Sequence, residues 1–347
     1  MRRAGADVRV AAARAPRELR TYALTDLVWA RAARAAATAG IAEHAPRAVL
    51  YHTVTAALLW PRPGAIRFDA PAAANRPGRH GVWQRPLERR RLAAAPLLVP
   101  VDPGTLAETP RPHAEAVVVP IPVAPSAGPA QAPAPAPASA AAAPAPAPAT
   151  ASAAAQAAAP APAAASASAA AQAPALAPAA RDIAALTYAA NPHKKGLDRV
   201  LRAWSRARRD DEELVVAGSD EPIDAPGVRV VGRLDPQAYR ALLRRARVFV
   251  CAPRREDYGI AQLEALADGC VLVTTTAPGP YAALPLAREL DPRLVVEHPG
   301  ALAPALRLAL DTPVAGYAQR AAAALVPFSR ASVDAVVRDE LLPRLLR

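Results

Sequence analysis

Lysine, aromatic residues and cysteine are all scarce in this chain of 347 residues. Of its 42 basic side chains only two are lysines, aromatic residues make up 4%, and there are two cysteines. Because no basic stripe with interleaved aromatic residues is present, a nucleic-acid-binding surface is not indicated. No apolar run reaches the roughly 18 residues of a membrane helix, and no apolar segment follows the N-terminal arginines as in a signal peptide. These absences predict a cytoplasmic protein and leave open attachment to the inner face of a membrane.

The cysteine and histidine pattern argues against a metal site. Cys251 and Cys270 lie on two predicted adjacent core strands, where buried thiols are the simplest expectation in a reducing compartment. No Cys/His cluster has metal-ligand spacing, and neither a P-loop nor a G-x-S-x-G turn occurs. We therefore expect no metal and no resident cofactor.

Composition divides the chain into three parts. Residues 124–180 contain no Asp, Glu, Lys or Arg and consist almost entirely of Ala, Pro, Ser, Gln and Thr. Such a tract buries too little apolar surface to offset the entropy of ordering it, so residues 124–181 are predicted to form a disordered linker. It separates an N-terminal domain, 1–123, from a C-terminal domain, 182–347. The N-terminal part carries 18 Arg against 9 acidic residues, which suits an anionic acceptor or membrane surface, although an arginine-rich background explains it equally well.

Strand and helix patterns alternate throughout the C-terminal part, which predicts an α/β domain with a doubly wound parallel sheet. Helices are predicted over residues 197–204 and 236–246 and after Gly259. The predicted strands are residues 186–190, 214–217, 228–231, 248–252 and 270–275. Ligands of such sheets bind at the carboxyl ends of the strands.

The most distinctive motif is the string EDYGIAQLEALADG at residues 256–269. It follows a predicted strand and places the carboxylates of Glu256 and Glu264 eight residues apart. A helix is expected to begin near its first glycine and to end at Gly269. The first helical turn would leave the N–H groups of Gly259, Ile260 and Ala261 free to bind an anion. Two hydroxyl-accepting carboxylates beside a phosphate cradle predict a sugar-nucleotide site.

This string resembles the E-x7-E motif of retaining GT-B glycosyltransferases of family 4, the glycosyl transferases group 1 type. The resemblance implies two Rossmann-like doubly wound domains facing a cleft, a nucleotide-diphosphate sugar as donor, and no metal requirement. It implies that Glu256 contacts the donor sugar and that Glu264 holds the ribose hydroxyls. Without the resemblance, an ordinary strand, turn and helix with two solvated glutamates remains the alternative.

The two lysines stand together in the segment NPHKKGLD. A lysine before a glycine that opens a helix is suited to bind phosphate as a point charge, and the family has a lysine in this K-G element. Lys195 is the better match, with Lys194 second, and the implied role is to stabilise the departing diphosphate. The family's preceding arginine is replaced by Ala189. Either Arg254 or Arg255 supplies the second charge, or one cation suffices.

Three further expectations concern substrate contacts. Gly232 and Arg233 resemble the family segment that lines the nucleotide base. On the acceptor side, Asp69 corresponds to a strand-end His or Asp of the family. His52, at the end of an apolar run, and His80, in a polar loop, are further candidates, each of which could equally be an ordinary surface residue.

The N-terminal domain is predicted to be a shortened version of the acceptor domain. Its helices are expected over 25–39 and 84–93. Its strands are expected at residues 8–12, 48–52, 64–68, 96–101 and 117–121. The family's opening strand and glycine-rich loop are not found. Residues 333–346 form an apolar-faced helix that in this family often crosses back to the first domain.

Together these features predict a glycosyltransferase that moves a hexose, with retention, from a nucleotide sugar to an acceptor that the residues do not identify. Two alternatives stay open. One is a catalytically impaired GT-B protein that binds a nucleotide sugar or a partner, which the short first domain and Ala189 favour. The other is a sugar-nucleotide epimerase or phosphorylase on the same fold.

Overall fold

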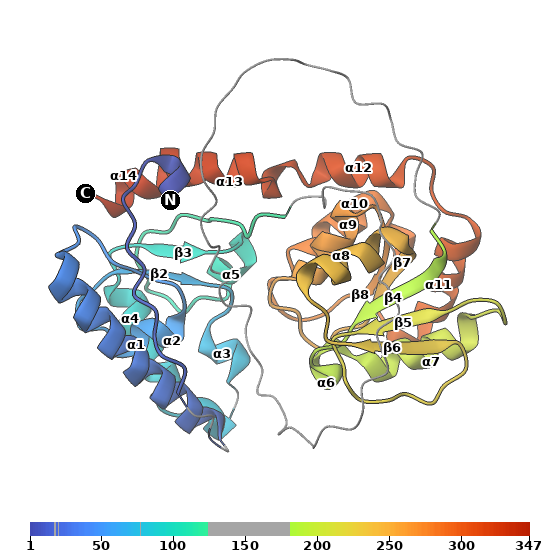
Figure 1. Ribbon diagram of the computed structural model, residues 1–347, viewed down its shortest axis with the longest axis horizontal. Helices are drawn as coiled ribbons and strands as arrows, with labels where there is room; N and C mark the ends of the chain where they lie inside the picture. Colours follow the sequence, from blue (N-terminus) through green and yellow to red (C-terminus); the bar gives the residue numbers. More distant parts are fainter. Residues whose placement is uncertain (17–18, 20, 77, 124–180) are drawn as a thin grey trace, which may run out of the picture.

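Two parallel sheets, each wrapped by helices, form two domains side by side in a computed structural model of the protein (Figure 1). The structure describes residues 1–16, 19, 21–76, 78–123 and 181–347. The predicted linker therefore lies, except for its last residue, outside the described residues.

The N-terminal domain has a three-stranded sheet in the order β1-β2-β3, with all strands parallel. The middle strand of this domain is β2, and the outer edge of β3 is hydrogen-bonded to the segment around Val117 and not to a further strand. Its elements, after the short turn η1 (Arg2–Ala4), are α1 (Tyr22–His44), β1 (Leu50–Tyr51), α2 (Val54–Leu58), β2 (Ala65–Phe68), α3 (Ala72–Asn75), η2 (Gly78–Gly81), α4 (Gln84–Ala94), β3 (Leu98–Pro100) and α5 (Pro103–Ala107).

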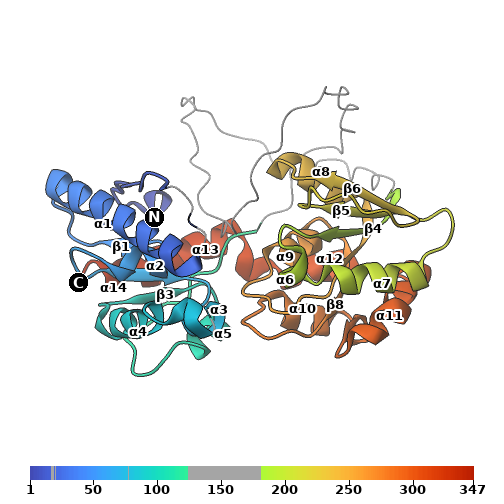
Figure 2. The same cartoon turned by 90° about the horizontal axis from the view of Figure 1, so that it is seen from below.

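The C-terminal domain has a six-stranded parallel sheet in the order β6-β5-β4-β7-β8-β9, which is the doubly wound arrangement. Helices cover both of its faces (Figure 2). Its elements are β4 (Ile183–Tyr188), α6 (Pro192–Lys195), α7 (Leu197–Ala207), β5 (Leu214–Ala217), β6 (Val228–Gly232), α8 (Pro236–Arg245), β7 (Ala246–Cys251), α9 (Ile260–Ala267), β8 (Val271–Thr275), α10 (Ala283–Leu290), η3 (Pro292–Leu294), β9 (Val295–Val296), η4 (Pro299–Ala301) and α11 (Leu302–Asp311).

Apolar spacing explains why these segments fold as they do. All four residues of β5 are buried, as expected of a strand covered on both faces. In α7 the buried residues Val200, Ala203 and Trp204 recur at helical spacing, and the Trp204 indole N–H donates to the Gly227 carbonyl at 3.0 Å. Burial of each large apolar side chain stabilises the fold by roughly 1.5–3 kcal/mol. Cys251 and Cys270 are buried free thiols, as predicted.

The C-terminal helices return to the first domain, as the family resemblance suggested. They are α12 (Tyr317–Ala324), η5 (Val326–Phe328), α13 (Arg330–Val336), η6 (Val337–Leu341) and α14 (Leu342–Leu345), and they run across the top of Figure 1 from one domain to the other. Val337 and Leu341 pack with Val99 and Val117 of the N-terminal domain in one buried apolar cluster. Where the chain leaves this domain, the Val123 amide donates to the Phe328 carbonyl at 2.8 Å.

Two predicted strands of the N-terminal domain are wrong. Residues 8–12 form no strand, and Val10 is 77% exposed, because no neighbouring strand pairs with this segment. Residues 117–121 form no strand either, although the Val117 amide donates to the Leu98 carbonyl and Ala116 forms an isolated bridge to Leu98. The domain thus keeps three of its five predicted strands, and its first regular element after η1 is a helix. This agrees with the predicted shortening.

Candidate functional site

The loops after strands β4 to β7 lie at the carboxyl edge of the large sheet, where the N-terminal domain meets it. The Tyr258 hydroxyl accepts a hydrogen bond from the Ile121 amide at 2.9 Å, and Arg255 binds the Glu108 carboxylate at 2.6 Å. Both contacts join the motif loop to the first domain. The sequence-predicted donor residues therefore face the space between the domains.

A tight turn carries the two lysines to this edge. The Asn191 side chain caps α6 by accepting from the Lys194 amide at 3.0 Å, and Gly196 ends the turn at a φ of +68°. A Cβ at Gly196 would stand 1.9 Å from the Ala252 carbonyl oxygen, so only glycine lets the turn lie directly on the loop after β7. This close approach brings residues 194 and 195 beside residues 256 and 257.

Lys195 and Glu256, the two residues predicted to act in catalysis, form an ion pair. The Lys195 ammonium lies 2.7 and 2.9 Å from the two carboxylate oxygens, and the side chains are 22% and 5% exposed. The Gln262 amide, on the first turn of α9, donates to the same carboxylate at 3.1 Å. Glu256 is thus held in one orientation by two donors. Gln262 was missed in the sequence, although a polar residue on an otherwise apolar helix face is a signal that could have identified it.

The N-terminus of α9 lies directly after this carboxylate. Gly259 is its N-cap residue and provides no side chain to accept from the first amides of the helix. Leu263 is the first residue whose amide donates within the helix, to the Gly259 carbonyl at 3.0 Å. The amides of Ile260 and Ala261 therefore stand at the positive end of the helix dipole, as the sequence predicted.

Glu264 lies one helical turn further along and is partly withdrawn from solvent, with a side chain 28% exposed. Burial raises the pKa of its carboxyl, while the charge of Arg240 lowers it. That guanidinium, 3.9 Å from Glu264, binds Asp268 more closely, at 2.5 and 3.0 Å. The Glu264 carboxylate is therefore ordered by a nearby cation whose closest bonds go to another residue.

The segment that was predicted to line the nucleotide base lies near Glu264. Gly232 ends β6, and the Arg233 amide donates to the Asp220 carboxylate at 3.2 Å, which the Arg233 guanidinium also pairs with at 3.2 Å. Tyr188 lies close enough to both Arg233 and Glu264 for their charges to act on its hydroxyl, and burial raises the pKa of this hydroxyl. Tyr188 was not predicted, although its place at the end of a strand is a usable signal.

Lys194 pairs with Asp257, which also accepts from Arg255 at 2.8 Å. This ion-pair group faces Asp69 at the end of β2. Burial, and next the charge of Asp257, raise the pKa of Asp69, while Lys194 lowers it. The structure therefore brings Asp69 together with donor-side residues across the gap between the domains.

Two arginines were candidates to replace the missing arginine of the family, and both are already paired with carboxylates. Ala189 is buried, and its amide donates to the Ala217 carbonyl at 2.8 Å. Arg254 binds Asp198 at 2.8 and 2.9 Å, on the side of α7. Arg255 is shared between Glu108 and Asp257.

The remaining acceptor candidates are separated. His52 follows β1 and lies near Arg67 on β2; burial, and next the charge of Arg67, lower its pKa. His80 lies in η2, between α3 and α4, and its side chain is outside the described part of the structure.

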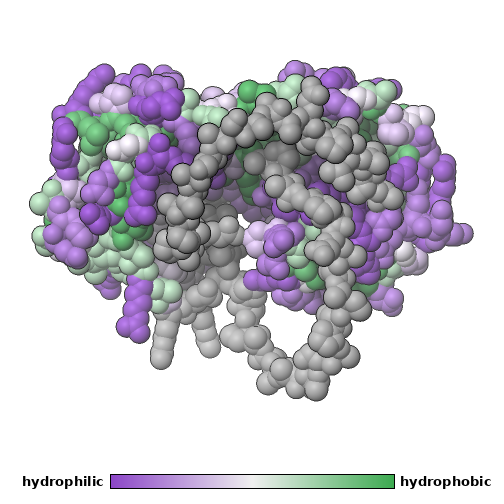
Figure 3. All heavy atoms as spheres, turned by 45° about the horizontal axis from the view of Figure 1, so that its top comes forward, coloured by the Kyte–Doolittle hydropathy of each residue, from purple (hydrophilic) through white to green (hydrophobic). Residues whose placement is uncertain are grey.

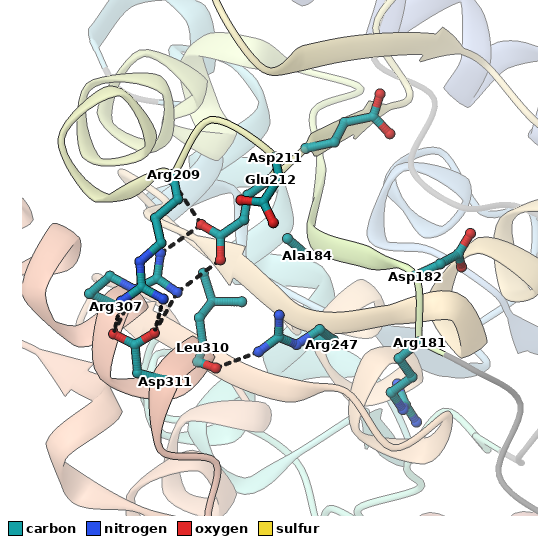
Figure 4. Close-up of a pocket in the computed structure, with 11 residues that line it drawn as sticks. Arg181, Asp182, Ala184, Arg209, Asp211, Glu212, Arg247, Arg307, Leu310 and Asp311 are labelled. Atoms are coloured by element: carbon teal, nitrogen blue, oxygen red, sulfur yellow. Dashed lines mark hydrogen bonds and ion pairs between the residues drawn. The ribbon is translucent and has the colours of Figure 1, made fainter.

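A separate pocket of about 450 Å³ lies at the opposite, amino edge of the large sheet (Figure 4). Four of its charged groups bind one another: Arg307 binds Glu212 at 2.6 Å and Asp311 at 2.9 Å, and Arg209 pairs with Asp311 at 3.0 Å. This ion-pair network joins α11 to the start of β5, so we assign it to stability.

No group of three or more His, Cys, Asp or Glu side chains among the described residues is placed to hold a metal ion, and metal independence stays a prediction. None of the helices in the described ranges has the length and apolar character needed to span a bilayer. On the face seen in Figure 3, hydrophilic residues predominate at the outer right-hand edge, over the C-terminal domain.

Comparisons with known proteins agree with this geometry. Residues 182–312 match the family model described as glycosyl transferases group 1, which confirms the resemblance stated from the sequence. Among curated proteins no match is found.

Solved structures extend the comparison to both domains. The sucrose-phosphate synthase of Thermosynechococcus elongatus is similar with a TM-score of 0.59 and 14% identity, over 91% of this chain and 77% of that one. A trehalose-phosphate synthase of Burkholderia xenovorans, in complex with glucose-6-phosphate, gives a TM-score of 0.59 and 16% identity over 93% and 80%. WaaG, a glycosyltransferase involved in lipopolysaccharide biosynthesis, gives 0.58 and 15% over 93% and 85%. The fold is therefore GT-B.

Proposed function

We propose that this chain is a glycosyltransferase that moves a hexose from a nucleotide-diphosphate sugar to an acceptor hydroxyl, with retention of configuration. The observation that carries the proposal is the partly buried Lys195–Glu256 ion pair beside the uncapped N-terminus of α9. It joins the two segments that resemble family motifs, although they lie 61 residues apart in the sequence. The match of residues 182–312 to glycosyl transferases group 1 supports the same reaction class.

Each group at this edge has a role in the proposed reaction. Glu256, oriented by Lys195 and Gln262, accepts hydrogen bonds from the donor sugar, and Glu264 accepts from the ribose. The amides of Ile260 and Ala261 meet the diphosphate, where the helix dipole favours negative charge. Gly232 and Arg233 border the nucleotide base.

Lys195 contributes most when the diphosphate departs, because negative charge grows on the leaving oxygen as the bond to the sugar breaks. The acceptor oxygen bonds to the anomeric carbon from the face that the diphosphate leaves. The acceptor proton then passes to a phosphate oxygen of the leaving group, so no side chain is needed as a base. Asp69, across the gap, accepts a hydrogen bond from the acceptor.

The test is binding of UDP-, GDP- and ADP-glucose by calorimetry to the wild type and to Glu264→Ala. We expect one nucleotide sugar to bind and its affinity to fall roughly tenfold to a hundredfold in the variant, because two ribose hydroxyls lose a charged acceptor. Glu297→Ala, which changes an exposed glutamate whose Thr276 contact lies outside the motif loop, is the control. No binding of any of the three by folded protein would refute the donor site.

A second candidate is favoured by one observation, the replacement of the family arginine by the buried Ala189. In that case the chain binds a nucleotide sugar without transferring it. Donor hydrolysis in the absence of acceptor separates the two: an active transferase slowly releases nucleoside diphosphate, and this release falls roughly thirtyfold in Lys195→Met. A protein that binds donor tightly and releases none is the impaired form. Interconversion of sugar configuration without release would instead indicate the epimerase that the fold also permits.

A further inference from the structure

Arg67 is a cation without a partner at the carboxyl end of the small sheet. It is only partly exposed, and burial lowers its pKa. Within the described residues its guanidinium makes no hydrogen bond and no ion pair; Tyr258 and Asp69 act on it only through their charge. A guanidinium has five N–H donors. No nitrogen of Arg67 is among the fully buried atoms without a hydrogen bond, so these donors are open to the space at the strand ends. They are therefore available to a group that the protein itself does not supply.

The register of the sheet shows what surrounds Arg67. Tyr51 of β1 pairs with Ile66 of β2, so the next residues, His52 and Arg67, lie opposite each other. Asp69 directly follows the end of β2, and its charge acts on the Arg67 guanidinium. The three side chains form a row at the strand ends, and the Tyr258 loop of the donor domain faces it.

The chemistry of this row fits a substrate with two kinds of group. Arginine offers a planar, forked set of donors that matches the oxygens of a phosphoryl group, and His52 adds a second donor beside it. Asp69 has no cation within ion-pairing distance among the described side chains, and a carboxylate in this position accepts from hydroxyl groups. A polyhydroxyl compound with a phosphoryl group satisfies both.

We propose that Arg67 binds a phosphoryl group on the acceptor while Asp69 holds the acceptor's hydroxyl groups. This inference rests on the proposed transferase function and names its acceptor class: a phosphorylated sugar or polyol, either free or as the headgroup of a lipid. The donor diphosphate is assigned elsewhere, because Lys195 and the α9 amides belong to the opposite domain. Arg67 is anchored on the acceptor side by β2, between its neighbours β1 and β3.

The test compares wild type, Arg67→Gln and the control Arg31→Gln, which removes an exposed arginine of α1 in the same domain. The probes are glucose 6-phosphate, glucose and inorganic phosphate in calorimetry, and vesicles of phosphatidylglycerol or phosphatidylcholine in a flotation assay. Binding of UDP-, GDP- and ADP-glucose is measured on the same samples. Thermal unfolding verifies that each variant is folded, and His52→Gln serves as a second variant of the same row.

We expect wild type and Arg31→Gln to bind glucose 6-phosphate or phosphatidylglycerol vesicles in preference to glucose or phosphatidylcholine. Arg67→Gln should lose roughly tenfold to a hundredfold in that affinity, and His52→Gln less, with donor binding unchanged in both. Preference for glucose 6-phosphate indicates a free acceptor, and preference for the vesicles a lipid headgroup.

Three results would overturn the inference. They are binding of no phosphorylated probe by wild type, equal binding by Arg67→Gln, and weakened binding of the donor alone, which would assign Arg67 to the diphosphate. Failure of all nucleotide sugars to bind wild type would instead refute the proposed function. The binding of phosphorylated probes would still test the role of Arg67.

Discussion

Replacing Lys195 by methionine should damage both stability and turnover, because this side chain neutralises a carboxylate that is 5% exposed. At 2.7 Å and an effective dielectric constant near 20, the pair attracts by about 6 kcal/mol. Lysine desolvation offsets part of this, and Gln262 continues to donate to Glu256 in the variant. We therefore expect the free energy of unfolding to fall by about 2–4 kcal/mol, near the range for breaking a buried pair.

The effect on turnover depends on the distance from the Lys195 ammonium to the departing oxygen, which is longer than the distance within the ion pair. If the ammonium lies about 4 Å from the departing oxygen, the interaction is about 4 kcal/mol. Half of this, realised only in the transition state, corresponds to a roughly thirtyfold fall in kcat. Urea unfolding and a steady-state assay of nucleoside diphosphate release measure the two effects on the same samples.

Lys194→Met is the matched control, since its partner Asp257 keeps Arg255 at 2.8 Å after the change. The control should lose less stability than Lys195→Met. A cycle of Lys195→Met, Glu256→Gln and the double variant should give a coupling energy of about 2 kcal/mol. If the two lysine variants behave alike, or if the coupling is near zero, the buried pair has no special role and the reasoning is wrong.

Two further predictions concern stability. Burial raises the pKa of Glu88 from 4.5 to about 7, so the folded state binds one more proton than the unfolded state between these pH values. This proton stabilises the fold by up to roughly 3 kcal/mol. The stabilisation is fully present below pH 4.5 and is lost as the pH rises through about 7. Glu88→Gln should flatten this slope in urea unfolding, and parallel pH profiles for variant and wild type would contradict it. Gly196→Ala and Gly316→Ala place a side chain at nearly equal φ, +68° and +69°, but only the first meets another atom, the Ala252 carbonyl oxygen at 1.9 Å. Gly316→Ala should lower the free energy of unfolding by the amount typical of the left-handed conformation, about 1 kcal/mol, and Gly196→Ala by clearly more. Thermal unfolding measures both, and equal shifts in melting temperature would show that the turn adapts freely.

The sequence predicted the C-terminal domain well because its strands are short apolar runs between turn residues. Residues 214–217 were predicted as a strand and form β5, with every residue buried. The helix after Gly259 and its end near Gly269 were likewise predicted from the glycines, and α9 spans Ile260–Ala267. Here local pattern and tertiary burial select the same structure.

The contacts between distant segments were not predictable in the same way. That Lys195 binds Glu256 depends on how closely Gly196 approaches the Ala252 carbonyl, which no local pattern encodes. Residues 8–12 have the apolar content of a strand but find no partner in the sheet, and sequence alone does not reveal pairing. Arg67 received no role for the same reason: its lack of a partner becomes visible only when its neighbours are known.

Because the C-terminal helices return to the first domain, the peptide connection between the domains is not needed to hold them together. Val337 and Leu341 belong to the apolar cluster of the N-terminal sheet, and the outgoing and returning chain segments are hydrogen-bonded to each other at Val123 and Phe328. Two separately expressed pieces, 1–123 and 181–347, should therefore assemble into one particle without any covalent link. In that particle the hinge would be the point where the two crossing segments meet, so the N-terminal domain would rotate together with the last helices of the other piece.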